Sequence, residues 1–482
     1  MQNILDFKKD YADAHVTLLE QNYRSTKTVL NAANSVIAHN MNRADKNLWT
    51  ENEQGEKISY YRGQNENDEA RYVVSKIQDE IRKPNRDYGS FAILYRTNAQ
   101  SRVIEETLLK ANIPYTMVGG HKFYDRKEIR DVLAYLTLLG NPRDSMSFER
   151  VINEPKRGIG QTSLEKLRLF ANDHGWSLLE ASKNIDLANE ISKRAKNSIS
   201  IFERTISGIA EKMDAMTITE LTEAVLDKSG YLSTLKASDT LQAQTRLENL
   251  EEFISVTQKY DQENPDQSGQ DNLVNFLSDL ALVSDQDDLD EENSEVTLMT
   301  LHAAKGLEFP VVFIMGMEEG LFPLARAAQD ESELQEERRL AYVGITRAKE
   351  KLYLTNAYSR MLYGKGQNNP ESRFIDEIKQ ELLDYENAGQ REKPLTTPFD
   401  RRTKRAVATT YHQPAQKVIK PKGTGADKAA WAVGDKVSHK AWGTGTVVKV
   451  SGTGEDMELD IAFEQKGIKR LLAAFAPITK QK

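Results

Sequence analysis

The opening quarter of the chain repeats a pattern in which short apolar runs are followed by stretches with apolar residues every three or four positions. A short run of this kind predicts a buried strand, and the three-to-four spacing predicts an amphipathic helix. Alternating strands and helices are typical of an α/β layer built on a parallel sheet. The predicted strands are residues 16–19, 90–97 and 113–120, and the predicted helices are residues 24–41, 68–83 and 100–111.

Beyond residue 123 the pattern becomes almost wholly helical, until an acidic stretch at 285–295 ends it. Strands and helices then alternate again. We therefore predict one α/β domain, residues 1–123 and 291–385, that is interrupted by a helical domain at 124–290, since insertions are tolerated where chain ends lie close together at a surface. After the insertion we predict strands at 296–302, 310–317 and 351–357, a short helix after the first of these strands, and a charged helix that begins near Glu336.

The last hundred residues differ from both of these domains. Residues 386–429 are rich in basic residues and contain several prolines but few large apolar side chains, which predicts a flexible basic linker. Residues 430–482 carry short alternating runs separated by glycine-rich turns. This pattern predicts a small β-barrel of about five strands.

Composition and charge narrow the chemistry. The 482 residues include no cysteine, which excludes disulfides, cysteine-ligated zinc and iron–sulfur clusters, and seven scattered histidines do not suggest a zinc enzyme, so no metal site is predicted. A net charge of −8 argues against a protein coated in positive charge, although a local groove can still be basic. The chain has no signal-peptide core and no apolar run of membrane-spanning length, so we expect a cytoplasmic location and no membrane contact.

Tyr23 and Arg24 stand where the first predicted strand gives way to a helix. Ligands of open α/β sheets bind at the carboxyl ends of the strands, so both side chains are candidates for ligand contact. Ser25 is placed to cap the helix. The residues alone leave a second interpretation open, in which Arg24 pairs with a nearby carboxylate and Tyr23 packs against the protein.

A second group of polar residues surrounds the strand predicted at 296–302. Thr300 and His302 share one face of this strand, because side chains alternate with a period of two. Gly306 lies in the turn that follows, and Glu308 immediately precedes the next strand. A single residue of this kind is usually structural, but polar groups at neighbouring strand ends of one sheet point into the same crevice.

Arg347 lies between the charged helix and the last α/β strand. An arginine presents a rigid fork of donors and keeps its proton, and its strongest use near an exposed sheet edge is to hold phosphate oxygens. Together with Arg24 it could stabilise the charge of phosphoryl transfer, as arginine fingers do. The sequence contains no Gly-x-x-x-x-Gly-Lys-Ser/Thr loop, so it offers candidate phosphate sensors without a phosphate cradle.

A glycine-rich turn within residues 154–167 is a third candidate site. Backbone amides in such a turn, and at the start of the helix that follows it, can bind an anion. The ordinary alternative is a helix–turn–helix hairpin without a ligand, because a Gly-x-Gly pattern is weak evidence. The candidate residues are Lys156, Arg157, Gly158, Gly160 and Thr162, and either Thr162 or Ser163 is predicted to cap the helix that follows.

These stretches together resemble the superfamily 1 helicases of the UvrD/PcrA/Rep group, and most closely its PcrA branch. The resemblance extends over essentially the whole chain, including the linker and the barrel. The stretches that carry it, in the order of the family's motifs, are LEQNYRS (19–25), YRTNAQSR (95–102), MVGGHKFYDRKEIRDVLAYL (117–136), TLMTLHAAKGLEFPVVF (297–313) and EERRLAYVGITRAK (336–349).

The resemblance implies a RecA-like domain that is split by a helical domain, with a first RecA-like domain and its phosphate loop upstream. MQNILDF (1–7) resembles the segment after the family's third motif, so the chain resembles the C-terminal part of a helicase. The implied reaction is ATP-dependent 3′ to 5′ DNA unwinding in replication and repair. It uses ATP with Mg²⁺, whose ligands are expected on the upstream domain, so the chain alone is expected to lack ATPase activity.

The resemblance also implies a role for each candidate residue. Tyr23 would stack on the adenine, Arg24 and Arg347 would reach the γ-phosphate, and Glu308, next to Gly306, would contact the nucleotide at its ribose. The turn at 154–167 would hold the backbone of duplex DNA, and the barrel would dock on RNA polymerase. The residues implied to line the single-stranded DNA track are Arg96, Asn98, Thr300 and His302.

Two other functions compete with a helicase motor. The chain could be a non-enzymatic protein that binds duplex DNA and RNA polymerase through the turn, the linker and the barrel. It could also resemble the helicase subunit of a recombination nuclease, but no clustered Asp/Glu-x-Lys nuclease segment follows the last α/β strand, only the linker and the barrel. Scattered apolar and basic residues of the barrel, such as Trp442, could equally be ordinary core and surface.

Overall fold

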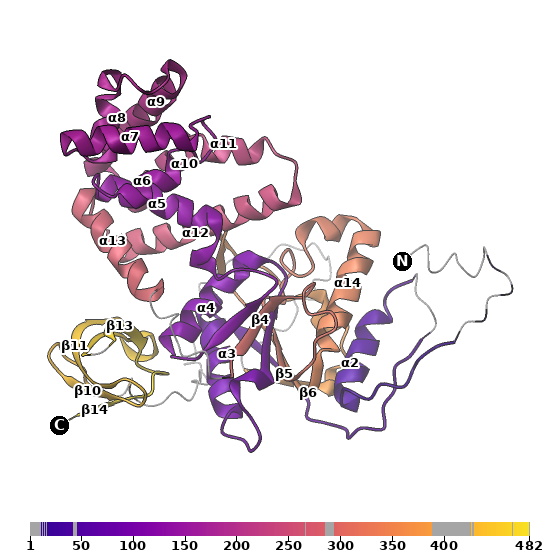
Figure 1. The fold of residues 1–482 in the computed structure, drawn as a ribbon. Helices are drawn as coiled ribbons and strands as arrows, with labels where there is room; N and C mark the ends of the chain where they lie inside the picture. Colours follow the sequence, from indigo (N-terminus) through magenta and orange to yellow (C-terminus); the bar gives the residue numbers. More distant parts are fainter. Residues whose placement is uncertain are drawn as a thin grey trace, which may run out of the picture.

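The computed structural model describes residues 17–41, 46–265, 267–284, 294–387, 429–464 and 466–481, together with Tyr11, Asp13, His15 and Ala426. They form a parallel sheet flanked by helices, a helical insertion, and a small antiparallel sheet near the C-terminus (Figure 1). The predicted fold class is therefore confirmed. Most of the predicted basic linker and acidic stretch, and the first ten residues, lie outside the described part of the chain.

Seven parallel strands of the described residues form the central sheet, in the order β3-β4-β2-β5-β6-β1-β9. Strands from before and after the helical insertion are neighbours in this sheet. Tyr95 of β2 is paired with Thr300 of β4, so the carboxyl ends of these two strands lie side by side. The strands are β1 (Ile58–Gly63), β2 (Phe91–Tyr95), β3 (Tyr115–Val118), β4 (Val296–Thr300), β5 (Phe309–Ile314), β6 (Ala348–Ala357) and β9 (Leu383–Tyr385).

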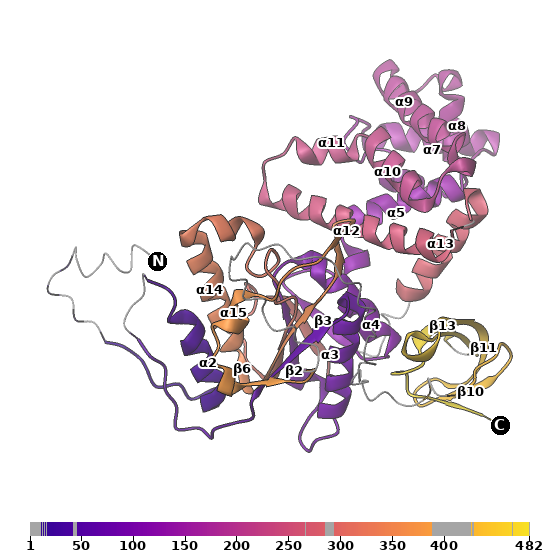
Figure 2. The ribbon, with the colours of Figure 1, turned by 180° about the vertical axis from the view of Figure 1, so that it is seen from behind.

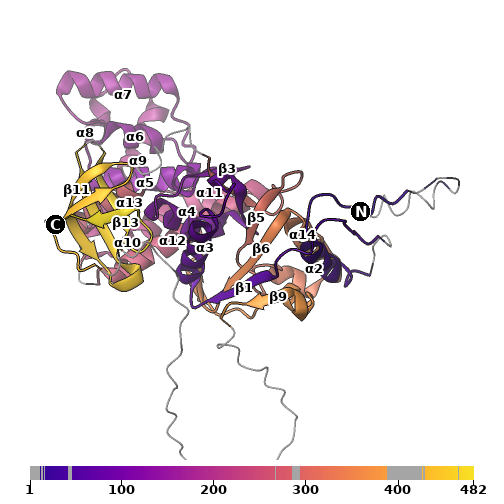
Figure 3. The same cartoon turned by 90° about the horizontal axis from the view of Figure 1, so that it is seen from below.

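Helices cover both faces of the sheet (Figure 3). Helices α2 (Lys27–Ile37) and α14 (Glu331–Ile345) pack on one face, and α3 (Glu66–Glu80) and α4 (Ser101–Lys110) pack on the other. The even-numbered residues of β2 enter the first of these cores and the odd-numbered ones enter the second, as the period of two requires. Because both faces are buried, the strand is apolar throughout, as is typical of central parallel strands.

Two predicted elements differ in the structure. Residues 17–20 are not a buried strand: Leu18 and Leu19 are exposed, and this segment joins the fold through an isolated bridge between Gln21 and Trp49. Residues 301–306 form turns rather than a short helix. The apolar pattern of residues 16–19 predicts a buried strand, but no described element covers this segment.

Sequence analysis also missed several strands. β1 and β9 form one side of the central sheet, where Tyr60 of β1 is paired with Leu354 of β6. A small antiparallel hairpin of β7 (Arg360–Leu362) and β8 (Lys365–Gln367) follows β6. These strands are short, and their tyrosines, glycines and charged residues do not form the apolar runs that mark the other strands.

The helical insertion packs around a single buried cluster. Local sequence sets several of its boundaries. Thr217 caps α10, and the carboxylate of Glu220 accepts a hydrogen bond from the backbone amide of Thr217; Ser177 and Glu180 form the same pair of bonds at α8. Its helices are α5 (Lys127–Gly140), α6 (Ser145–Val151), α7 (Gln161–His174), α8 (Leu178–Lys183), α9 (Lys193–Ala210), α10 (Ile218–Lys228), α11 (Tyr231–Lys236), α12 (Leu241–Glu263) and α13 (Gly269–Ser284).

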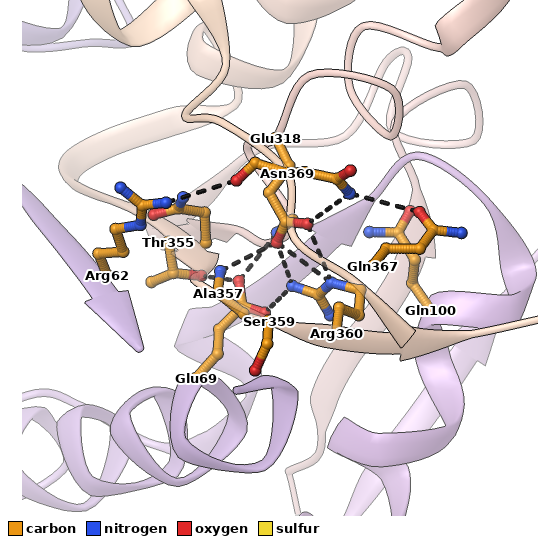
Figure 4. A network of polar contacts seen from close by, with 12 residues as sticks. Arg62, Glu69, Gln100, Glu318, Thr355, Ala357, Ser359, Arg360, Gln367 and Asn369 are labelled. Carbon is orange, nitrogen blue, oxygen red and sulfur yellow. Dashed lines mark hydrogen bonds and ion pairs between the residues drawn. The ribbon is translucent and has the colours of Figure 1, made fainter. Parts of the chain in front are cut away.

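A buried ion-pair network anchors the β7–β8 hairpin to the sheet (Figure 4). The guanidinium group of Arg360 lies between two carboxylates: it donates to Oε1 of Glu318 over 2.6 Å and also to Glu69. Glu69 in turn accepts from the backbone of Gly316 and the hydroxyl of Thr355. Because every charge in this group is buried and bonded, the hairpin is held rigidly against α3 and β6.

The tip of this hairpin reaches the helical insertion. The backbone amide of Gly364 donates to Oγ of Ser255 on α12 over 2.9 Å, and that of Tyr363 donates to Glu252. Glu252 also accepts a hydrogen bond of 2.7 Å from Arg102 of α4, and both side chains are almost fully buried. Helix α12 is therefore attached to the α/β unit from two directions.

Near the C-terminus, five antiparallel strands of the described chain form a second sheet in the order β13-β12-β11-β10-β14. The predicted five-strand β-unit is thus present. Trp442 stacks on His439 with ring centroids 4.1 Å apart, and both rings pack on the core of this sheet. The strands are β10 (Lys436–His439), β11 (Gly443–Ser451), β12 (Glu458–Phe463), β13 (Gly467–Leu472) and β14 (Ile478–Lys480).

Candidate functional site

The loop that carries Tyr23 and Arg24 is shaped by the side chain of Asn22. Its Oδ1 accepts hydrogen bonds of 2.9 Å from the backbone amides of both Arg24 and Ser25, which closes a tight local turn. The Ser25 hydroxyl does not cap α2, as the sequence had suggested. It donates instead to the carbonyl oxygen of Ala348 over 2.6 Å and so fixes the loop to the start of β6.

Arg24 and Arg347 come together at Thr346. Nη1 of Arg24 donates to the carbonyl oxygen of Thr346 over 3.3 Å, and Nη2 of Arg347 donates to its hydroxyl over 3.2 Å. Arg347 is further fixed by the carbonyl oxygens of Val343 and Leu307, each at 3.0 Å. Burial, and secondly the charge of Arg24, lower the pKa of Arg347. Two like charges at such a place favour an anionic ligand between them.

Glu308 is the counterion of this group. Its carboxylate accepts from Nζ of Lys349 at 2.8 Å and from Nε of Arg24. The hydrogen bonds from Lys349 and Arg24 lower the pKa of Glu308 to about 2. The alternative that Arg24 pairs with a carboxylate thus holds in this structure. The carboxylate of Glu308 and the guanidinium group of Arg24 both remain partly exposed, so solvent can still reach the ion pair.

Gly306 and Tyr23 frame this cluster. Gly306 has a φ of +91°, a conformation that favours glycine, and it lies in the turn just before Glu308. Tyr23 has an exposed fraction of 78%, and its hydroxyl donates to Gln21 over 2.9 Å. It does not pack into the protein, so the alternative of a packed Tyr23 is wrong. A large exposed aromatic ring next to Arg24 in the chain suits the stacking of a planar base.

A second group of predicted residues lies at the ends of β2 and β4, and two of its four members line a cavity of about 440 Å³. Arg96 and His302 line this cavity, and the hydroxyl of Thr300 accepts from the backbone amide of Ala303, which shapes the turn that carries His302. Asn98 follows β2, and its carbonyl oxygen accepts from Arg126. The predicted DNA-track residues therefore lie along one edge of the sheet.

Arg96 is already paired within this cavity. Its guanidinium group donates to both oxygens of Glu337 on α14, with the shortest contact at 2.7 Å. Partial burial, and secondly the charge of Arg96, lower the pKa of His302 and so favour its neutral imidazole. A neutral imidazole beside a paired arginine presents hydrogen-bonding groups with little net charge.

The turn at 154–167 lies at the outer end of the helical insertion, far from the sheet in two opposite views (Figures 1 and 2). Lys156, Gly158, Gly160 and Thr162 are exposed there, and Gly160 rather than Thr162 is the cap of α7. Arg157 differs from the other candidates. Its guanidinium group points inward and donates to the carbonyl oxygens of Val151, Ile152, Pro155 and Ser229 and to the hydroxyl of Tyr135.

Three further residues, none of them predicted from the sequence, organise these groups. Glu337, which holds Arg96, falls three positions after the buried Leu334 on the inner face of α14, so helical spacing could have found it. Asn22 precedes the candidate arginine and is a residue typical of tight turns. Lys349 gave no signal, because its contact with Glu308 depends on the pairing of strands distant in the sequence.

Fold and site together define a class of protein. A parallel sheet carries arginines and polar residues at its strand ends, a helical unit interrupts it, and a small antiparallel sheet follows. This is the arrangement expected of the second motor domain of a superfamily 1 helicase.

Comparison with known proteins gives the family. Residues 17–359 match the UvrD-like helicase C-terminal domain, and residues 433–480 match the PcrA/UvrD tudor domain. The chain belongs to the UvrD-like helicase C-terminal domain family.

Relatives described as ATP-dependent DNA helicase PcrA are similar over the whole chain. The protein from Leuconostoc citreum is 53% identical over 485 residues, which cover 100% of this chain and 65% of the relative. The protein from Bacillus subtilis (strain 168) is 54% identical over 486 residues, which cover 99% of this chain and 64% of the relative. That from Staphylococcus aureus (strain NCTC 8325 / PS 47) is 49% identical, with 100% and 64% covered. The chain thus spans slightly less than two thirds of the length of these relatives.

Within the described residues, no helix is both long enough and apolar enough to cross a membrane.

Proposed function

We propose that this chain supplies the arginine half of an ATP site in an ATP-dependent 3′ to 5′ DNA helicase. The observation that carries the proposal is the meeting of Arg24 and Arg347 at Thr346, beside the exposed ring of Tyr23. In this proposal both arginines bind the γ-phosphate and Tyr23 stacks on the adenine. Glu308 contacts the ribose, and Gly306 in the preceding turn belongs to the same nucleotide site. Similarity to helicases named PcrA supports it.

The phosphate loop and the ligands of Mg²⁺ belong, in this proposal, to a further domain of the complete protein. The sequence contains no Gly-x-x-x-x-Gly-Lys-Ser/Thr loop. The described residues include no group of three or more His, Asp or Glu side chains that could hold a metal ion. The chain alone then lacks ATPase activity. When ATP joins the two domains, contacts with the γ-phosphate close the cleft, and hydrolysis releases it.

Arg24 has to change partners for this to happen. It is paired with Glu308 in the present structure, and Glu308 is also held by Lys349. A phosphate with two or more negative charges competes well with one partly exposed carboxylate for the same guanidinium group, since an exposed ion pair contributes only about 0–1 kcal/mol. Glu308 then becomes available to accept from a ribose hydroxyl.

The DNA substrate is assigned to two surfaces. Arg96, Asn98, Thr300 and His302 line the path of single-stranded DNA along the sheet edge, where the cavity of about 440 Å³ lies. The exposed turn with Lys156, Gly158, Gly160 and Thr162 holds the backbone of duplex DNA through amides and positive charge. We leave Arg157 out of this contact because both of its terminal nitrogens donate to groups of the protein.

The remaining assignments follow from the same proposal. The motor domain comprises residues 1–123 and 291–385, the helical insertion 124–290, the linker 386–429 and the barrel 430–482. The barrel has RNA polymerase as its expected partner. Replication and repair of DNA in the cytoplasm are the expected setting.

The test is the ATPase rate of a protein that contains this chain together with its phosphate-loop domain. Arg347→Ala lowers kcat by on the order of 10³-fold, because the charge on the transferring phosphoryl group loses a stabilising donor. Arg82→Ala is the matched control, since Arg82 is exposed and pairs only locally with Asp79 among the contacts described for it. An Arg347→Ala rate within a few-fold of the unmodified protein contradicts the proposed site.

The non-enzymatic alternative gives a different result. A protein that only binds DNA and a polymerase shows no DNA-stimulated ATP hydrolysis even with the phosphate-loop domain present. Its DNA affinity falls with salt, because each phosphate contact releases counterions. Salt-dependent binding together with no ATPase activity in the complete protein supports that alternative over the motor.

A further inference from the structure

The C-terminal sheet is docked on the rest of the protein through one side, made of β12, β13 and the turn at 473–476. Leu472, Ala474 and Phe475 belong to the same buried core as helices α3 and α4. Phe475 has an exposed fraction of 2%, and its carbonyl oxygen accepts from Gln78 of α3 over 3.0 Å. The C-terminal sheet lies beside α4 and α13 in both views of Figures 1 and 2.

Ion pairs surround this small apolar contact. Lys110 at the end of α4 donates to Glu458 of β12 over 2.5 Å. Arg71 of α3 pairs with Asp456 in the turn before β12. The sheet is therefore joined to the α/β unit by apolar packing at its centre and by charge at its edge, which is the usual build of a protein interface.

The same side of the sheet also contacts the helical insertion. Nη2 of Arg470 on β13 donates to Asp279 of α13 over 3.0 Å and to Asp460 of its own sheet over the same distance. Helix α13 and strand β13 are in contact. The C-terminal sheet thus contacts both the α/β unit and the helical insertion. These two units otherwise contact each other through α12 and the β7–β8 hairpin.

A row of charges along α4 connects the two junctions. Arg102, Glu106 and Lys110 are spaced by four residues, so they lie on one face of the helix. Arg102 binds Glu252 of the insertion, and Lys110 binds Glu458 of the C-terminal sheet. Glu106 lies between them. Its carboxylate accepts a hydrogen bond of 2.8 Å from the hydroxyl of Tyr124 and one of 3.1 Å from Arg102.

We propose that the C-terminal sheet is a releasable brace that fixes the orientation of the helical insertion relative to the parallel sheet. Its β12–β13 side is occupied by this chain's own α4 and α13. An external protein that binds this side must first release the brace, whereas one that binds the opposite side, where Val433 and Val448 are exposed, leaves it in place. The inference does not depend on the nucleotide site.

Two physical features support release rather than permanent attachment. The contact has a small apolar centre, and relative motion between units is the default unless their interface is large and hydrophobic. Its ion pairs are partly exposed, so salt screens them and their contribution falls. The brace therefore holds at low salt and opens under conditions that leave each unit folded.

Distance measurements by fluorescence energy transfer test the brace. Because the chain has no cysteine, dyes can be placed at Asn197→Cys on α9 of the insertion and Glu53→Cys before β1 in the α/β unit, both exposed positions. Lys110→Glu and Glu458→Lys each place like charges opposite one another. We expect each to lose most of the high-transfer population at low salt, and the double variant to recover it.

Lys436→Glu is the matched control, because it makes the same charge change at an exposed position of β10, two strands away from β12 in the sheet. It keeps the transfer efficiency of the unmodified chain. Circular dichroism and thermal unfolding identify a variant that misfolds, and Asp279→Asn then provides a conservative change at the second contact. Folded Lys110→Glu, Glu458→Lys and Asp279→Asn chains with unchanged transfer efficiency, from low to high salt, overturn the brace.

Discussion

Arg24 and Arg347 are held by opposite ends of one residue: Arg24 by the carbonyl oxygen of Thr346 and Arg347 by its hydroxyl. Arg24 and Thr346 are 322 residues apart in the sequence. The two guanidinium groups contact the same residue only because α14 and β6 return to the loop that Asn22 shapes. This relationship leads to the first prediction.

The two arginines act as a unit, so their substitutions are not additive. Arg24→Ala and Arg347→Ala each lower ATPase kcat by on the order of 10³-fold in the complete protein. The double variant loses little more than either single variant, since removing one donor already misplaces the phosphate for the other. Steady-state ATPase rates of the four proteins measure this. A double variant whose loss equals the product of the single losses shows two independent sites.

Stacking by Tyr23 requires its ring and not its hydroxyl. Tyr23→Ala raises KM for ATP by about tenfold, because stacking of a base on an aromatic ring contributes about 1–3 kcal/mol. Tyr23→Phe keeps the KM of the unmodified protein, since the hydroxyl only contacts Gln21. Thermal stability stays the same in both variants because the ring is exposed. An equal increase of KM in both variants assigns the role to the hydroxyl instead.

Lys156 and Arg157 are neighbours with different tasks. Lys156→Ala weakens duplex binding and reduces the salt slope by about one phosphate contact, while the fold remains stable. Arg157→Ala removes donors from several buried carbonyl oxygens and lowers the unfolding temperature of the helical insertion. DNA-binding titrations at several salt concentrations, together with thermal unfolding, separate the two. If the Arg157→Ala chain is as stable as the unmodified chain but has a reduced salt slope, Arg157 contacts DNA and the prediction is wrong.

The Arg360 network is predicted to be sensitive to removal of its cation. Arg360→Met leaves Glu69 and Glu318 buried and facing one another, which destabilises the protein by about 3–5 kcal/mol. The loss is visible in denaturant unfolding, and hydrogen exchange increases in the β7–β8 hairpin. Adding Glu318→Gln to Arg360→Met recovers part of the stability, because one unpaired charge is removed. No recovery in the double variant means that packing, and not charge, is what Arg360 supplies.

Glu106 gives a dependence of stability on pH. Burial by itself raises its pKa, but Arg102 and Lys110 outweigh burial and bring the pKa to about 2 from 4.5. A carboxyl group with a lowered pKa stabilises the folded state above its unfolded pKa and loses this contribution as the pH falls toward its folded pKa. Glu106→Gln thus lowers stability at neutral pH by on the order of 2 kcal/mol and flattens the decline between pH 4.5 and about 2.

Thermal unfolding midpoints over this pH range test the prediction for Glu106. Glu165→Gln is the control, because Glu165 is exposed on α7 and lies away from the α4 row. It retains the pH dependence of the unmodified chain. A Glu106→Gln chain with the same decline as the unmodified chain shows that other carboxylates cause it.

Local pattern was sufficient for much of this protein. The apolar run of β2 and the three-to-four spacing of α2 and α14 define strand and helices, because a side chain's exposure follows the period of its own backbone. The helical character of the insertion and the five short strands near the C-terminus followed in the same way. The candidate residues at the ends of β2, β4 and α14 were also visible, since parallel strands present their carboxyl ends at one edge.

The tertiary structure decided what those residues contact. It placed Arg24 against Thr346, turned Arg157 inward, joined Arg96 to Glu337 and docked the C-terminal sheet on α4 and α13. None of these contacts follows from periodicity. The direction and partner of a long charged side chain depend on groups that approach from distant parts of the sequence, whereas the period of a strand or helix depends only on its neighbours in the chain.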